Sequence, residues 1–167
     1  MGDGMQFSYK KGQGATEYLV LLAVVLIVAM VAIALLGFFP GLAGDAKIAQ
    51  SDSYWRGTAR PFAILEHSQT AGEANMTMVI QNVDADQRQI TAISVVGSGI
   101  TGNASTYLTT VQNQYWSSGE KKIATLDFSG NCTSGNTYEY SVNFTYNTGS
   151  ISGMKQYGEK TLVGKCN

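Results

Sequence analysis

The sequence has few of the side chains on which metal sites and most enzyme active sites depend. It contains a single histidine, His67, with no cysteine close to it in the chain, and this excludes the usual ligand spacing of a transition-metal site. It has no glycine-rich phosphate-binding loop and no strand-to-helix segment that would present a nucleophilic serine. We therefore expect a protein that is not an enzyme and that holds no metal ion and no cofactor.

Charged residues are also scarce, and their signs balance. The chain has 11 basic and 12 acidic residues, a net charge of −1 and a charged fraction of 14%, against about 25% in a typical soluble domain. A basic patch for a nucleic-acid partner is missing, and so is a polybasic segment for a membrane surface. Low charge together with 19 glycines and many serines, threonines and asparagines is typical of an extracellular, β-rich surface.

Cysteine occurs twice, at Cys132 and Cys166. If this part of the chain is exported, the two can form a disulfide, and closing a loop of about 35 residues would stabilise the fold by roughly 3–4 kcal/mol. In a reducing cytosol they would instead remain free thiols. Asn-x-Ser/Thr sequons favour export, since this motif is the acceptor for N-glycosylation; the candidate asparagines are Asn75, Asn103, Asn131 and Asn143.

One long run of the sequence is entirely apolar. It covers the 21 residues from Leu19 to Phe39 and contains no charged or strongly polar side chain. As a helix it would be about 31 Å long, which matches the ~30 Å hydrocarbon core of a bilayer. It is also longer than the apolar part of an ordinary secretory signal, which has about 7–15 residues. The sequence therefore predicts a membrane-spanning helix near the N-terminus.

The residues around this run set the expected limits of the helix. We expect it to begin between Gly14 and Thr16, and we expect Gly37 and Pro40 to kink or break it. A second, shorter helix is predicted at residues 45–55, ended by the dipeptide at residues 60–61, because the residue before a proline disfavours the helical conformation.

From Phe62 onward, apolar and polar residues alternate with a period of two, which is the pattern of β-strands. The clearest strand is Tyr138–Tyr146, with its aromatic and valine side chains on one face. In the strand expected at 89–96, strict alternation places Ile90, Ala92 and Ser94 on one face. Further strands are expected at residues 75–81, 106–112, 122–128 and 160–163. Turn clusters and no helix separate them, so the predicted fold class is α+β: a long N-terminal apolar helix followed by an antiparallel β-sandwich or barrel-like head domain.

The segment that opens the apolar run carries a recognisable motif. Gln13, Glu17 and Leu21 fit the pattern Gln-x-Ser-x-Glu-x-x-x-Leu, and Ala15 stands at the position of the small serine. In these residues the chain resembles the class III signal peptides of archaeal type IV pilins. The resemblance covers about 30 N-terminal residues, and the β-rich part of the sequence has no motif that we can match.

The resemblance implies a processing site as well as a family. In such proteins a prepilin peptidase cuts on the cytoplasmic side of the membrane, before the apolar run. The cut would fall between Gly12 and Gln13, with Lys10 and Lys11 serving leader recognition, and Glu17 would become the fifth mature residue. The implied organisation is a cleaved leader at residues 1–12, a transmembrane and filament-core helix with its extension at 13–60, and an extracellular head domain at 61–167.

The same resemblance implies how the mature chain would assemble. Cleavage creates a positive α-amine on Gln13, and Glu17 of an incoming subunit can pair with that amine on a neighbour in the dry filament core. The implied partners are further copies of the chain in a homopolymer, the peptidase and the pilus assembly machinery, the membrane before assembly, and a surface or cell as adhesion target. The implied location is an extracellular filament at the cell surface.

Three alternatives remain open from the sequence. The chain could be an uncleaved, membrane-anchored surface-binding protein with the same topology. It could be a subunit of an archaellin-type motility filament. It could also be an ordinary secreted protein cut after Ala43, where Gly41-Leu42-Ala43 offers small residues, although the apolar run is long for such a signal.

Overall fold

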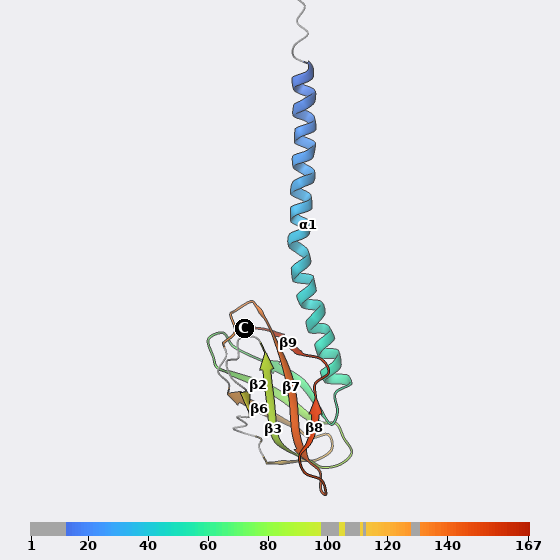
Figure 1. The fold of residues 1–167 in the computed structure, drawn as a ribbon, viewed down its shortest axis with the longest axis vertical. Coiled ribbons are helices and arrows are strands. Elements are labelled where there is room, and N and C mark those ends of the chain that lie inside the picture. The colour runs from blue at the N-terminus through green and yellow to red at the C-terminus, as the bar shows by residue number, and fades with distance from the viewer. Residues whose placement is uncertain (1–12, 98–103, 106–110, 112, 128–130) are drawn as a thin grey trace, which may run out of the picture. The chain divides into compact units, whose positions relative to one another are not determined.

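The computed structural model describes residues 13–97, 104–105, 111, 113–127 and 131–167 (Figure 1). The chain divides into two compact units, with the boundary between Ala43 and Gly44. The first unit contains most of one long helix, and the second contains the end of that helix and all the strands. We refer to residues 44–167 as the head.

Helix α1 spans Gln13–Gly57 as one element. It starts one residue before the predicted range of Gly14 to Thr16. Of the kink or break expected at Gly37 and Pro40, a break was wrong, and the second helix expected from residue 45 is the last part of α1. A proline inside a helix removes one backbone N–H donor and disturbs one preceding carbonyl, and the hydrogen bonds on both sides of Pro40 carry the helix onward. The helix ends just before Arg60-Pro61, as expected.

Within the described residues, nine strands follow the helix, and most of the predicted strands are among them. The strand expected at 106–112 lies outside the described residues except for Val111, and the last strand is two residues later than expected. The bounds are β1 Phe62–Ser68, β2 Asn75–Asn82, β3 Arg88–Gly97, β4 Ala104–Ser105, β5 Tyr115–Trp116, β6 Lys121–Asp127, β7 Thr137–Asn147, β8 Met154–Tyr157 and β9 Leu162–Lys165.

The strands form two antiparallel sheets. The first has the order β1-β2-β6, and the second has the order β4-β3-β7-β8, with β5 paired to β3 and β9 paired to β7. Residues of both sheets belong to one hydrophobic core; for example, the ring of Phe62 in β1 lies 5.5 Å from that of Phe144 in β7. The head is therefore arranged as a sandwich, and the barrel-like alternative is wrong because the two sheets do not close on each other.

The inward faces of the best-patterned strands are those expected from the sequence. Met76, Met78 and Ile80 of β2 are fully buried. The alternate residues of β7 are also buried, and they are Tyr138, Tyr140, Val142, Phe144 and Tyr146.

Strand β3 departs from strict alternation. Its buried residues are Ile90, Ile93 and Val95, whereas alternation had placed Ala92 with Ile90. The pairing with β7 shifts register between Ile90 and Ala92, and an extra residue at such a bulge moves every later side chain to the opposite face. The face expected for Ala92 and Ser94 was therefore wrong.

The end of α1 is packed into the head. Trp55 is 1% exposed, with its ring edge-on to Phe144 at a centroid distance of 6.3 Å. Gly158 makes room for it, because a Cβ at that position would lie 2.6 Å from the indole. One turn earlier, the backbone N–H of Val163 donates to Ser51 Oγ at 2.9 Å. The last turns of α1 are thus part of the head's core and cover the outer edge of β9.

A disulfide and a buried amide join distant parts of the head. Cys132 and Cys166 form the disulfide that the sequence favoured for an exported chain. Gln156 in β8 is 6% exposed, and its side chain donates to the carbonyl of Phe62 at 2.8 Å and accepts from the N–H of the same residue at 2.9 Å. This one side chain therefore acts as a backbone-like bridge between the two sheets.

The Gln156 bridge predicts that substitutions at two neighbouring positions of β8 have different effects on stability. Gln156→Ala would leave two buried backbone groups of Phe62 without partners and lower the free energy of unfolding by about 2–5 kcal/mol. Lys155→Ala, at the exposed neighbouring position, would change it by less than about 0.5 kcal/mol. Chemical denaturation of the head measures both values. Equal midpoints for the two variants would show that the bridge does not hold the sheets together.

Candidate functional site

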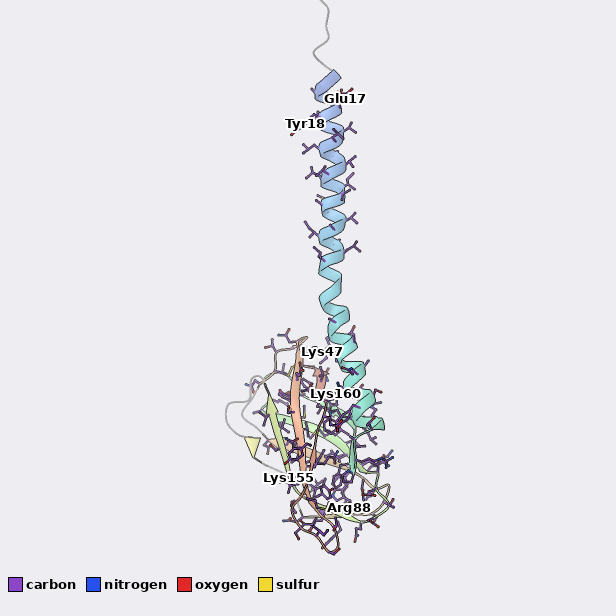
Figure 2. The ribbon with its side chains drawn as sticks, turned by 45° about the vertical axis from the view of Figure 1, so that its right-hand side comes forward. Glu17, Tyr18, Lys47, Arg88, Lys155 and Lys160 are labelled. Carbon is purple, nitrogen blue, oxygen red and sulfur yellow. A yellow bond between two sulfur atoms is a disulfide. The ribbon has the colours of Figure 1, made fainter. Side chains whose placement is uncertain are left out.

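The largest apolar surface described in the chain lies on the first part of α1. Residues 14–36 form a segment of 23 residues with a mean hydropathy of 3.4, and none of it is buried. By length and composition this segment could cross a membrane. Its side chains point outward all around the helix axis (Figure 2). The large exposed ones are Tyr18, Leu19, Val20, Leu21, Leu22, Val24, Val25, Leu26, Ile27, Val28, Met30, Val31, Ile33, Leu35 and Leu36.

This surface is too apolar to remain in water. Burying one large aliphatic side chain is worth about 1.5–3 kcal/mol, so the whole segment represents on the order of tens of kcal/mol. That exceeds the net stability of a typical domain, roughly 5–15 kcal/mol. Because a helix that is apolar on all sides is covered on all sides, we infer that its surroundings are lipid or other apolar helices.

Glu17 is the only charged residue between Lys11 and Asp45. It lies in the second turn of α1 and is exposed, beside Tyr18 (Figure 2). A carboxylate near a helix N-terminus is favoured by the helix dipole, while full burial in a bilayer centre would cost about 2.5–3.5 kcal/mol on insertion scales. The carboxylate therefore marks the polar end of the apolar segment.

The positions expected for processing lie at the edge of what the structure describes. Gln13 is the first residue of α1. Lys10, Lys11 and Gly12 lie outside the described residues. The leader, the cut site and the pairing of Gln13 with Glu17 therefore remain predictions.

The four sequons occupy different environments. Asn131 is exposed in the loop before Cys132, whereas Asn75 is half-buried at the start of β2. Asn143 lies within β7, where its Oδ1 accepts a hydrogen bond from the N–H of Gly158 at 3.2 Å. The fourth, Asn103, lies outside the described residues.

The acidic turn before β3 is closed by an arginine. The guanidinium of Arg88 contacts a carboxylate oxygen of Asp84 at 2.6 Å and one of Asp86 at 3.5 Å. This hydrogen bond from Arg88 holds the pKa of Asp84 below its usual value. Within the described part of the chain, no three His, Cys, Asp or Glu side chains gather into a possible metal site.

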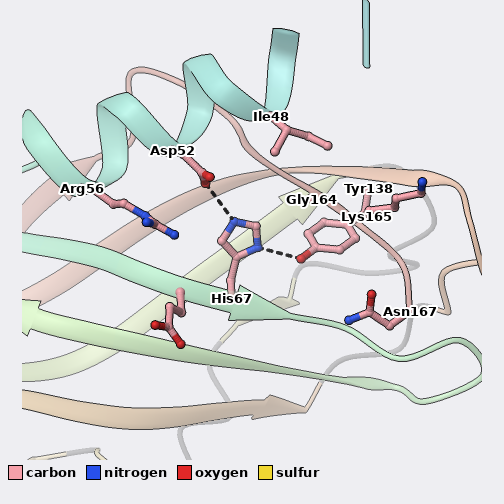
Figure 3. Close-up of a pocket in the computed structure, with 9 residues that line it drawn as sticks. Ile48, Asp52, Arg56, His67, Tyr138, Gly164, Lys165 and Asn167 are labelled. Carbon is pink, nitrogen blue, oxygen red and sulfur yellow. Dashed lines mark hydrogen bonds and ion pairs between the residues drawn. The ribbon is translucent and has the colours of Figure 1, made fainter. Parts of the chain in front are cut away.

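One cluster in the head had no signal in the sequence. His67 Nδ1 lies 2.6 Å from Tyr138 Oη, and its Nε2 lies 3.7 Å from Asp52 Oδ1. The three residues come from α1, β1 and β7, and they border a cleft of about 360 Å³ (Figure 3). Since each stands alone in its own segment, only the packing of α1 on the two sheets brings them together.

The comparison with known families concerns the N-terminal segment. Residues 10–36 match the family model of the class III signal peptide. No curated protein sequence matches the chain. The match includes the expected cut site, Glu17 and most of the apolar run, and it confirms the resemblance inferred from the motif. It indicates a secreted filament subunit of the type IV pilin-like or archaellin-like kind, which implies processing by a prepilin peptidase and assembly into filaments.

The exposed apolar segment predicts a difference in solubility. The full chain would require detergent or lipid to remain monomeric, because water cannot cover residues 14–36. A chain that starts at Gly44 keeps the whole head and would be monomeric in buffer alone. Size-exclusion chromatography with light scattering distinguishes the two. A full chain that stays monomeric without detergent or lipid would contradict the assignment.

Proposed function

Since residues 10–36 carry a class III signal peptide, we propose that this chain is a structural subunit of an archaeal type IV pilus that serves adhesion. The chain enters the membrane with Lys10 and Lys11 on the cytoplasmic side and the head outside. The peptidase removes residues 1–12, and the mature chain then polymerises through the apolar part of α1. The observation that carries this proposal is the fully exposed apolar helix directly behind the signal motif.

Polymerisation exchanges one apolar environment for another. Before assembly, lipid covers residues 14–36, and in the filament the same segments of neighbouring subunits cover one another. Since lipid and leucine are about equally apolar, close packing and polar contacts rather than the hydrophobic effect drive this association. Small residues let neighbouring helices approach closely. Within the segment they are Gly14, Ala15, Ala23, Ala29, Ala32 and Ala34.

Glu17 supplies the polar contact in this mechanism. Cleavage before Gln13 leaves a positively charged α-amine, and Glu17 is the only carboxylate of the apolar segment. In a dry filament core a charge without its partner costs about 3–5 kcal/mol. A subunit that enters out of register leaves both charges unpaired, so the Glu17–amine pair selects one axial position.

Features of the head favour its proposed location outside the cell. The head is stabilised by a disulfide, which forms and persists in an oxidising compartment. It carries few charges and several sequons, as expected for a surface exposed outside the cell. An uncleaved anchor would share this head but would lack an α-amine near Glu17, and a motility filament would share the signal and the polymer.

The proposed pair predicts that Glu17 is needed for assembly and not for processing. Glu17→Ala and Glu17→Gln would each leave the neighbour's α-amine unpaired and reduce filament yield by on the order of 100-fold or more. The 12-residue leader would still be removed, which the mass of the membrane-bound chain shows. Tyr18→Phe keeps the ring at the adjacent position and serves as the matched control. Normal filaments from Glu17→Ala, counted by electron microscopy, would defeat the mechanism.

The environments of the sequons predict which asparagines are glycosylated. Asn131 is exposed in a loop and would carry glycan in native filaments. Asn143 is engaged by Gly158 within β7 and would remain unmodified. Glycopeptide mass spectrometry of surface material measures both occupancies, and Asn131→Gln would remove the glycan mass. Glycan on Asn143 with Asn131 bare would overturn this assignment.

A further inference from the structure

The single histidine of the chain lies where three elements of the head meet. His67 in β1 faces Tyr138 of β7 on one side of its ring and Asp52 of α1 on the other (Figure 3). Its side chain is 9% exposed. We call these three residues the histidine clasp, because the contact from Asp52 to His67 links the last turns of α1 to both sheets.

The hydrogen bond between His67 and Tyr138 favours a neutral histidine. His67 Nδ1 and Tyr138 Oη are 2.6 Å apart, so only one hydrogen atom fits between them. If the ring is neutral with its proton on Nε2, Tyr138 donates to Nδ1, and the Nε2–H faces Asp52. If the ring is protonated, Nδ1 also becomes a donor, and the hydroxyl proton of Tyr138 loses its acceptor. Burial raises the pKa of Tyr138, so the hydroxyl keeps that proton.

The space around the ring is also restricted. A Cβ on Gly164 of β9 would lie 2.7 Å from His67 Cε1, and it would overlap the hydroxyl of Tyr138. Glycine is thus required where β9 passes the clasp, and β9 blocks movement of the ring in that direction. The cleft lies beside the same ring, which leaves a side on which water can reach an opened clasp.

Charged residues of both signs line the cleft beside His67. Asp52 and Arg56 come from α1, Glu66 from β1, and Lys165 from β9. Burial lowers the pKa of His67; it outweighs the carboxylate of Asp52, which raises that pKa, and Arg56 lowers it further. The distance of 3.7 Å to Asp52 is too long for a hydrogen bond, so the carboxylate acts on the ring mainly through its charge.

We propose that the histidine clasp is a pH-dependent contact between the last turns of α1 and the strands of the head. The contact is stable while His67 is neutral, and it weakens when His67 is protonated. The clasp contributes its full stabilisation of the packed α1 at pH values above the ordinary histidine pKa of about 6.5. This stabilisation is lost as the pH falls below that value, because the opened state then binds a proton that the closed state does not. The proposal rests on the head alone and is independent of cleavage and of polymerisation.

Since the chain has one histidine, its titration can be followed directly. The full chain in detergent micelles, labelled with ¹³C at the histidine Cε1, would give a single signal whose shift with pH reports the pKa of His67. We expect a midpoint below 6.5. Asp52→Asn would lower it further, and Tyr138→Phe would raise it, because the hydroxyl that favours the neutral ring is gone. A wild-type midpoint at or above 6.5 would overturn the proposal.

Hydrogen exchange then tests whether titration loosens α1. The N–H of Val163 is bonded to Ser51 and that of Glu159 to Tyr54, so both amides report release of the helix. After correction for intrinsic exchange, the protection factors of both amides would fall as the pH is lowered from 8 to 5. The maximum decrease is about tenfold for each unit by which the pKa of His67 in the opened clasp exceeds its pKa in the closed clasp.

A variant that cannot titrate supplies the control for this exchange measurement. His67→Gln keeps a polar side chain but removes the titration, so protection of the two amides would no longer change over this range. The same pH dependence in His67→Gln as in the wild type would assign the effect to another group and overturn the proposal. If Tyr138→Phe fails to fold, His67→Gln and Asp52→Asn still decide the outcome.

Discussion

Helix α1 exposes fifteen large apolar side chains between Tyr18 and Leu36, and the need to cover that surface is the constraint on which the rest of the account depends. Lipid can cover it in a single inserted chain, and neighbouring helices can cover it in a filament. In the proposed function, the class III signal peptide at residues 10–36 connects these two states, because cleavage would free the helix from its leader. In the proposed filament, the charge of Glu17 would distinguish a correct contact between helices from an incorrect one.

The same helix that provides the apolar surface ends as part of the head. Trp55 and Ser51 belong to α1, and they fill the core beside Gly158 and support the backbone of β9. These contacts make the last turns of α1 part of the hydrophobic core of the head. The histidine clasp lies among these contacts, and it is the place where acid would weaken the attachment.

Much of this arrangement followed from local patterns in the sequence. The length of the apolar run, the period-two faces of β2 and β7 and the signal motif were all readable, because each depends on neighbours close in the chain. The face of β3 was wrong, since the bulge after Ile90 comes from pairing with β7. The break at Pro40 was wrong because a single missing hydrogen bond did not stop the helix. The clasp could not be predicted, since Asp52, His67 and Tyr138 meet only through tertiary packing.

The central claim is that a mature, processed chain polymerises through its apolar helix, and its N-terminus on native surface filaments tests this most directly. Mass spectrometry of the N-terminal peptide from filaments purified from the cell surface would show a chain that begins at Gln13. A chain that begins at or near Met1 would identify an uncleaved anchor and contradict the account. A chain that begins at Gly44 would show that the apolar segment is only an export signal, and it would contradict the account as well.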